Sequence, residues 1–366
     1  MGASVSGAIS RRDVLKTAAA AGLAYASMQF VSRPARAAAE VLELTWPGYD
    51  APELYKSYVA KHGGMPEFAY IGSEEESLQK MKSGWVPDLM HPGNYNVQRW
   101  HDADILQPID PSRVTTWPDM FEPIRKEPSI YVDNKLYMVP SEFGNSSVIF
   151  RTDLVDPEYQ SKPSWKLLYD ERYAGKLAMY NSAENIVECA ALVLGMKNIF
   201  SLSDDQLKQV DQLARKQRKL MRFYWDDATQ LEQALASGEV VAAYGWNQSL
   251  VNLKKQGLAV SMMVPSEGIL TWIAGFVMNK KAKNVDACYD LINSWTSPES
   301  GAHVIDNLGY GSTNSKAYPL VSDARRAELG FTDPEGMLKG SIIVETIAPE
   351  TKKKYEDLVL KVQSGG

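Results

Sequence analysis

The stretch Thr229–Trp246, TQLEQALASGEVVAAYGW, contains the unit from which the fold of this 366-residue chain is predicted. Thr229 to Ala236 reads as a helix, and Gly238 ends it, because glycine readily adopts the left-handed backbone that closes helices. Val240 to Tyr244 follows as a short apolar run that is typical of a buried strand. A helix followed at once by a buried strand indicates an α/β protein.

The same alternation extends in both directions along the chain. We predict strands at 41–45, 67–71, 87–90, 148–151, 177–180, 259–264 and 275–278. We predict helices at 52–62, 96–102, 183–194 and 285–295, and two more that begin at the capping residues Ser73 and Ser203. Strands that alternate with helices favour an α/β fold with mostly parallel sheets.

Composition excludes several classes of protein. The chain is 45% hydrophobic and 10% aromatic, as folded globular proteins are, and its net charge of −6 opposes binding to nucleic acid or anionic membranes. Its four histidines form no metal-binding spacing, so we predict no metal and no other cofactor. No nucleophile-elbow, zinc-protease or phosphate-loop pattern occurs, so we predict no catalytic residues. Cys189 and Cys288 are expected to be buried thiols, with a disulfide as the open alternative.

The first 37 residues have the pattern of a cleavable export signal. Polar and basic residues, including Arg11-Arg12, precede an apolar stretch from Thr17 to Val31 that is too short to span a bilayer. The paired arginines resemble the twin-arginine signal, and an ordinary signal peptide is the alternative. We expect cleavage after Ala37 and a soluble periplasmic protein of about 330 residues, a length that suits two lobes. Cleavage removes five basic residues and one acidic residue, which makes the net charge −10.

Aromatic residues follow the predicted strands or, for Trp272 and Tyr310, sit beside turn glycines, at the edge where open α/β sheets bind ligands. They are Trp46, Tyr49, Tyr95, Trp246, Trp272 and Tyr310. A single aromatic residue in such a position commonly fills the core, but six at equivalent positions predict a ligand site. Aromatic walls can enclose an alkyl chain and hold a cation over their ring faces.

Several motifs resemble those of the bacterial spermidine/putrescine-binding proteins. Thr45-Trp46-Pro47-Gly48-Tyr49 is similar to their first-strand loop, and residues 87–95 with 105–110 resemble their "YDLVVPSTYYV…MIQKID" stretch. Four further motifs continue in the family's order, at residues 173–177, 236–240, 246–249 and 308–310. The resemblance covers nearly all of the chain after the export signal, and it places the six aromatic residues at the family's ligand box.

The resemblance implies a type II periplasmic binding fold, in which two α/β lobes are joined by two crossing strands and enclose the ligand. We place lobe one at 40–143 plus 274–315 and lobe two at 144–273, with crossings near Phe143 and Ile273 and with C-terminal helices at 316–366. The implied function is that of a monomeric substrate-binding component, which passes a small molecule to the permease of an ABC importer. An exported enzyme on the same fold and a sensor module for a membrane receptor are the alternatives.

The acidic residues depart from the family's pattern. Polyamine binders hold the ligand's ammonium groups with acids at two places, where this chain has Ser182 and Asn185, and Ala274. Because a buried dication without counter-charges costs several kcal/mol, the pattern favours a small amine or zwitterion with fewer positive charges than spermidine. Glu142 and Asp227 are the candidate counter-charges, and the open alternatives are a surface position for Glu142 and a helix cap for Asp227.

Neutral partners complete the candidate site. Asn94, Ser182 and Asn185 offer hydrogen bonds that suit a ligand carboxylate or hydroxyl better than a second cation.

Overall fold

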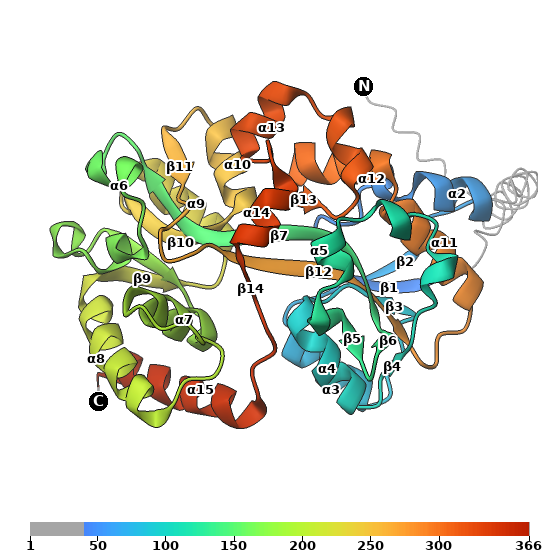
Figure 1. Cartoon of the computed structure of the whole chain (residues 1–366), viewed down its shortest axis with the longest axis horizontal. Helices are drawn as coiled ribbons and strands as arrows, with labels where there is room; N and C mark the ends of the chain where they lie inside the picture. Colours follow the sequence, from blue (N-terminus) through green and yellow to red (C-terminus); the bar gives the residue numbers. More distant parts are fainter. Residues whose placement is uncertain (1–39, 366) are drawn as a thin grey trace, which may run out of the picture. The chain divides into compact units, whose positions relative to one another are not determined.

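A computed structural model of the protein describes residues 40–365 (Figure 1). The expected export signal, residues 1–37, and its cleavage site at Ala37 lie outside the described residues. Within residues 40–365, no helix combines the length and apolar character needed to cross a membrane.

The chain builds one main sheet of twelve strands. Eight of them follow the order β2-β1-β3-β12-β7-β10-β8-β9, while β4 and β14 pair with β12, and β11 and β13 pair with β7. The bounds are β1 Leu42–Thr45, β2 Glu67–Tyr70, β3 Leu89–Met90, β4 Leu106–Gln107, β7 Met138–Arg151, β8 Leu177–Tyr180, β9 Met221–Trp225, β10 Ala242–Trp246, β11 Val260–Met262, β12 Leu270–Asn279, β13 Gly311–Ser312 and β14 Ile342–Ile343. A separate hairpin pairs β5 Tyr131–Val132 with β6 Lys135–Leu136.

Helices connect the strands. They are α2 Lys56–His62, α3 Glu74–Lys82, α4 Val97–Asp102, α5 Glu122–Arg125, α6 Glu158–Ser161, α7 Ala183–Val193, α8 Asp204–Leu220, α9 Ala228–Ser237, α10 Asn247–Lys255, α11 Val285–Trp295, α12 Pro298–His303, α13 Asp323–Leu329, α14 Pro334–Gly340 and α15 Pro349–Ser364. Serine side chains cap the first turns of α3, α7 and α8, and Gly238 ends α9 in the left-handed conformation at φ 76°.

The predicted elements agree with the structure in kind, but the predicted pairing does not. Five pairings of the main sheet are parallel and six are antiparallel, so the expectation of mostly parallel sheets is wrong. The reason is that β7 and β12 run antiparallel to each other and to most of their neighbours. Each is also much longer than predicted, because both strands continue from one core into another.

Two apolar cores lie at the two ends of these long strands. The core of lobe one contains Met138 and Val139 of β7 and Phe276 to Met278 of β12, whereas the core of lobe two contains Val148 to Phe150 and Leu270. Phe143 and Ile273, near which crossings are predicted, are register partners in the middle. Figure 1 shows β7 and β12 side by side along this path. The two strands therefore join two α/β lobes.

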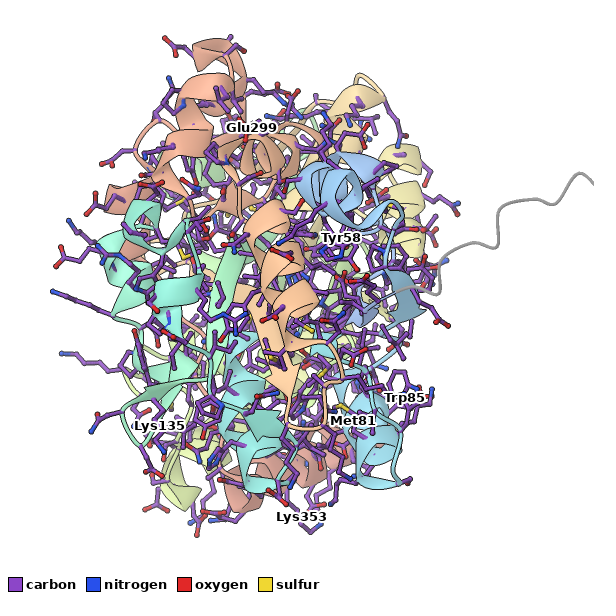
Figure 2. The ribbon with its side chains drawn as sticks, turned by 90° about the vertical axis from the view of Figure 1, so that its right-hand side faces the viewer. Tyr58, Met81, Trp85, Lys135, Glu299 and Lys353 are labelled. Carbon is purple, nitrogen blue, oxygen red and sulfur yellow. The ribbon has the colours of Figure 1, made fainter. Side chains whose placement is uncertain are left out.

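Lobe one is covered by helices from distant parts of the chain. The Tyr58 amide on α2 donates to Ser294 Oγ on α11 at 3.3 Å, and Figure 2 shows Tyr58 beside that helix. Cys288 is buried on α11 in this core, while Cys189 is buried on α7 in the core of lobe two. Both cysteines are free thiols, as predicted.

The last fifty residues pack on the crossing strands and then on lobe two. A third, smaller core surrounds the middle of β7 and β12 and includes Tyr318, Phe331 and Leu338. The chain then pairs with β12 through β14 and ends in α15, which packs on α7 and α8 of lobe two. The hydroxyl of Tyr355 anchors α15 by donating to Ile199 O at 2.9 Å.

Candidate ligand-binding site

Two predicted aromatic residues follow β1 and contact the loop after β3. Trp46 Nε1 donates to His91 O at 2.8 Å, and the Tyr49 amide donates to Trp46 O at 3.1 Å. Tyr49 is buried, and its ring lies 5.2 Å from the His91 ring in an edge-to-face arrangement. This part of the site is therefore fixed by backbone and ring contacts within lobe one.

Trp272 and Tyr310 meet at the crossing strands. Their ring centroids are 4.9 Å apart and nearly perpendicular. The indole of Trp272 lies across its register partner Gly144, where a Cβ atom would come within 2.2 Å of the ring. Tyr310 OH donates to Gln248 Oε1 on α10 at 3.4 Å, so this aromatic pair reaches from lobe one to lobe two.

Trp246 ends β10 in lobe two and belongs to a group of aromatic rings. Its ring lies 5.0 Å from those of Tyr180 and Trp225, which end β8 and β9. Sequence reasoning missed Tyr180 and Trp225, although the same signal, an aromatic residue at the end of a strand, could have found them. Tyr180 is half-buried and Trp225 is fully buried, so Tyr180 is the additional candidate for ligand contact.

Tyr95 connects the two lobes from the other side. Its ring folds over Gly93, whose amide donates to Glu74 Oε1 at 2.8 Å. Burial raises the pKa of Tyr95 well above its ordinary value, and the neighbouring Glu74, Tyr180 and Tyr244 raise it further. Tyr180 and Tyr244 of lobe two therefore act electrostatically on Tyr95 of lobe one.

The side chain of Asn94 is fully engaged within the protein. Its Nδ2 donates to Ser129 Oγ and to Val344 O, each at 2.8 Å, and its Oδ1 accepts from the Ile273 amide at 3.2 Å. Asn94 is completely buried. It thus ties the loop after β3 to β12 and to the segment after β14.

Glu142 lies on β7 at the crossing and is completely buried. Its Oε2 accepts from Ser141 Oγ at 2.5 Å and lies 3.1 Å from His91 Nε2, whereas its Oε1 has no hydrogen-bond partner among the described residues. The carboxylate raises the pKa values of both Tyr49 and Tyr310, in each case after burial, which has the larger effect. The Glu142 carboxylate therefore acts electrostatically on two of the predicted aromatic residues, Tyr49 and Tyr310.

Ser182, Asn185 and Asp227 lie at helix starts in lobe two. Ser182 caps α7 by accepting from the Asn185 amide at 3.3 Å, and Asn185 Nδ2 donates to Glu188 Oε2 at 2.9 Å. Asp227 caps α9 by accepting from the Thr229 amide at 2.8 Å, and its side chain is exposed. Ser182 and Asn185 are half-buried, and the Ser182 amide donates to Tyr180 O at 2.9 Å.

Charged residues that sequence reasoning missed lie near Ser182 and Tyr95. Glu184 pairs with Lys352 of α15 at 2.7 Å; burial opposes ionisation of Glu184, but this ion pair lowers its pKa below the ordinary value. Burial raises the pKa of Glu74, and Lys352 partly offsets this. Only the return of α15 to lobe two brings Lys352 here, so no local sequence signal could have placed it.

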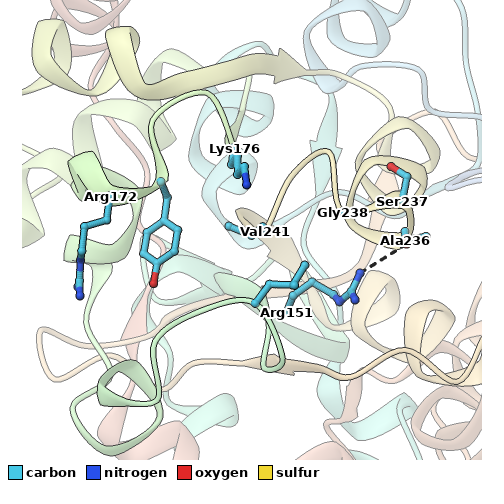
Figure 3. Close-up of a pocket in the computed structure, with 9 residues that line it drawn as sticks. Arg151, Arg172, Lys176, Ala236, Ser237, Gly238 and Val241 are labelled. Carbon is cyan, nitrogen blue, oxygen red and sulfur yellow. Dashed lines mark hydrogen bonds between the residues drawn. The ribbon is translucent and has the colours of Figure 1, made fainter.

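A hollow of about 510 Å³ lies elsewhere in lobe two, between Arg151, Arg172 and Lys176 (Figure 3). Arg151 donates to Leu235 O at 3.0 Å and pairs with Asp153, and Arg172 pairs with Asp156, Asp170 and Glu158. Both arginines are thus neutralised. The hollow contains none of the predicted site residues.

Comparisons with known proteins define the class of this chain. Residues 53–328 match the model of the family described as bacterial extracellular solute-binding protein, and the chain belongs to that family. Within residues 40–365, no group of three or more histidine, cysteine or acidic side chains is placed to hold a metal ion.

Two relatives come from Escherichia coli K12. The chain is 24% identical over 335 residues to the putrescine-binding periplasmic protein PotF and 25% identical over 327 residues to the spermidine/putrescine-binding periplasmic protein. Each match covers 87% of this chain and 90% of the relative. Among solved structures, the spermidine/putrescine ABC transporter substrate-binding protein PotD of Streptococcus pneumoniae superposes with a TM-score of 0.78 at 19% identity. That match covers 89% of this chain and 99% of the other, and it shows the two-lobed fold.

Proposed function

We propose that this protein is the periplasmic substrate-binding component of an ABC importer and that it captures a small amine or zwitterion between its lobes. The observation that carries the proposal is the convergence of aromatic residues from both lobes at the crossing strands. Tyr310, whose ring meets that of Trp272, donates to Gln248 of lobe two, and Tyr180 of the Trp246 ring group raises the pKa of Tyr95. The named relatives are polyamine-binding periplasmic proteins, which supports the same class of ligand.

The charges support a ligand with one cationic end. Glu142 supplies a buried carboxylate behind Tyr49 and Tyr310, and we favour it over Asp227 as the counter-charge, because the carboxylate of Asp227 caps α9. At the opposite end of the aromatic set, Lys352 faces Glu184 beside the half-buried Ser182 and Asn185. Because Lys352 is already paired with Glu184, this end offers Ser182 and Asn185 as neutral hydrogen-bonding groups for a ligand carboxylate or hydroxyl. A zwitterion such as an ω-amino acid would satisfy both ends.

We further propose that lobe one comprises 40–143 plus 274–315, that lobe two comprises 144–273, and that the protein acts as a monomer. In this proposal, the residues after 315 return across both lobes, and binding closes the lobes over the ligand. A closed form that the permease recognises would have to be stabilised by contacts from both lobes, since a ligand shifts an equilibrium only by its difference in affinity for the two states.

Calorimetry with a ligand panel tests the proposed function. The panel is putrescine, spermidine, 4-aminobutyrate and succinate, and each is titrated into the mature protein. We expect the tightest binding from 4-aminobutyrate or another singly charged amine, and strong weakening in Glu142→Gln, because removing one partner of a buried charge costs several kcal/mol. Asp227→Asn is the matched control and should retain binding. Tight binding of spermidine, or tight binding of succinate that is indifferent to Glu142→Gln, would contradict the proposed ligand class.

A further inference from the structure

Three ionisable side chains form a buried cluster in lobe one beneath Tyr49. They are Glu43 on β1, His91 after β3 and Glu142 on β7, and all three are completely buried. We call them the lobe-one carboxyl cluster. Solute capture by aromatic walls does not itself require such a cluster, and burying ionisable groups in a core is costly unless they are paired.

The hydrogen bonds of the cluster fix its geometry. Ser141 Oγ lies 2.9 Å from His91 Nε2 and 2.5 Å from Glu142 Oε2, so the serine links the imidazole to the carboxylate. The His91 ring is enclosed by aromatic neighbours, with centroid distances of 5.2 Å to Tyr49, 4.4 Å to Phe276 and 5.0 Å to Trp295. The cluster is therefore rigid and shielded from solvent.

Some polar atoms of the cluster have no partner. Among the described residues, His91 Nδ1 and Glu142 Oε1 make no hydrogen bond. At most one imidazolium is available to balance two carboxyl groups. The cluster would thus carry an uncompensated negative charge if both carboxyl groups were ionised, and a buried charge of that kind is strongly disfavoured.

A carboxyl group of the cluster relieves this charge by taking up a proton. Burial raises the pKa of Glu43 to about 7, His91 and the hydroxyls of Tyr55 and Thr45 lower it, and Glu142 raises it further. Tyr55 OH donates to Glu43 Oε2 at 2.9 Å. Glu43 is therefore the carboxyl group that takes up the proton, and the charge of Glu142 strengthens its hold on that proton.

Other ionisable groups also face the cluster and bear on its charge. A carboxylate of the cluster raises the pKa of each of these groups. They are Tyr49 before η1 (Pro52–Tyr55), Tyr55 at the end of η1, Tyr58 on α2, Tyr70 on β2, Cys288 on α11 and Tyr310 before β13. None of these six brings a positive charge. A cation near the cluster must therefore come from outside, and Tyr49 and Tyr310 form the wall through which it would act.

We propose that the lobe-one carboxyl cluster holds an exchangeable proton in the empty protein and releases it to solvent when a cationic group binds against Tyr49 and Tyr310. The bound cation replaces the proton as the counter-charge, so one positive charge enters as one leaves. Glu142, whose carboxylate affects both tyrosines, is the specificity-determining residue in this exchange. The inference rests on the proposed capture of an amine and adds that capture depends on pH.

Calorimetry of putrescine and 4-aminobutyrate binding between pH 5.5 and 8.0 tests the proposal, because their ammonium groups do not titrate in this range. Each titration is repeated in two buffers of different ionisation enthalpy, which gives the number of protons released. We expect release approaching one proton, and affinity that rises up to about tenfold per pH unit below the cluster's titration and levels off above it. Glu43→Gln and Glu142→Gln should each abolish the release.

Two further variants make the test specific. Glu76→Gln, an exposed acid paired with Lys80, should retain the release. Tyr55→Phe removes a donor to Glu43 and keeps all three ionisable groups, so it should shift the midpoint to higher pH even if the glutamine variants fail to fold. Binding without proton release, or release unchanged in folded glutamine variants, overturns the inference alone. Failure of both amines to bind at every pH overturns the proposed function together with it.

Discussion

Glu43 is a carboxyl group enclosed in the core of lobe one, and its contribution to stability depends on pH. Its pKa is raised to about 7 in the folded protein, against 4.5 when exposed, so the folded state holds the proton more tightly. The stabilisation is fully present below pH 4.5 and is lost as the pH rises through about 7. The shift corresponds to a loss on the order of 3 kcal/mol in the free energy of unfolding.

Glu43→Gln should remove this dependence. Urea unfolding at pH 5, 6, 7 and 8 should show the wild type losing stability relative to the variant as pH rises. Burial also raises the pKa of Glu188 to about 7, but Glu188 is present in both proteins and its effect cancels in the comparison. Parallel stability curves for the two proteins would show that Glu43 does not exchange a proton in this range.

Trp246, which is half-buried, should contribute to ligand affinity. The ring is held edge-to-face by Tyr180 and Trp225, so it is fixed in place before a ligand arrives. Trp246→Ala should weaken binding of the tightest panel ligand about tenfold, as expected for the loss of a cation over an aromatic face. Trp85→Ala is the matched control, since Trp85 lies on the outer side of lobe one near Met81 (Figure 2). Equal affinities for wild type and Trp246→Ala would assign Trp246 to the core alone.

At the scale of elements, the crossing strands β7 and β12 owe their close fit to Gly144. The indole of Trp272 occupies the space above Gly144, so a side chain at position 144 would collide with it. Gly144→Ala should therefore displace Trp272, lower the free energy of unfolding by roughly 1–3 kcal/mol and weaken ligand binding. Thermal unfolding and calorimetry measure the two effects.

Two comparisons isolate the cause of this effect. Gly64→Ala is the control, because a Cβ atom at Gly64 meets nothing within 4 Å. In the double variant Gly144→Ala/Trp272→Ala, the stability lost in Gly144→Ala should be partly restored, since the colliding ring is gone. A Gly144→Ala protein as stable as wild type would show that the strands adjust without cost.

At the scale of the whole molecule, three segments pass between the two cores: β7, β12 and the chain after β14. Asn94 joins two of them, since it binds the Ile273 amide of β12 and the Val344 carbonyl after β14. Ligand binding should close the lobes about these segments. We expect the radius of gyration from small-angle scattering to fall and tryptophan fluorescence to be quenched when the panel's tightest ligand is added. No change in either with saturating ligand, compared with a panel member that does not bind, would contradict closure.

Local signals in the sequence determined most of the elements. Serine caps mark the starts of α3 and α8, and a terminal glycine marks the end of α9. The strand β8 and the helix α11 have the predicted bounds, and α8 begins directly after its predicted cap. Trp46, Tyr49 and Tyr95 follow strands and Trp246 ends one, whereas Trp272 lies within β12 and Tyr310 precedes β13; the rings of Trp272 and Tyr310 meet. The caps and element bounds depend on residues that are close in sequence, and a pattern of side chains suffices to predict them.

Only the tertiary structure decided how charges and strands are partnered. Glu142 meets His91 from 51 positions away, Lys352 meets Glu184 only because α15 returns to lobe two, and β7 pairs antiparallel with β12 although neighbouring strands are parallel. Asn94, which is predicted to offer hydrogen bonds to a ligand, makes hydrogen bonds to Ser129, Val344 and Ile273 within the protein. Burial, pKa and pairing register depend on which distant segments exclude water from a group. The sequence shows which ionisable and polar groups are present, but only the folded chain determines which partners they meet.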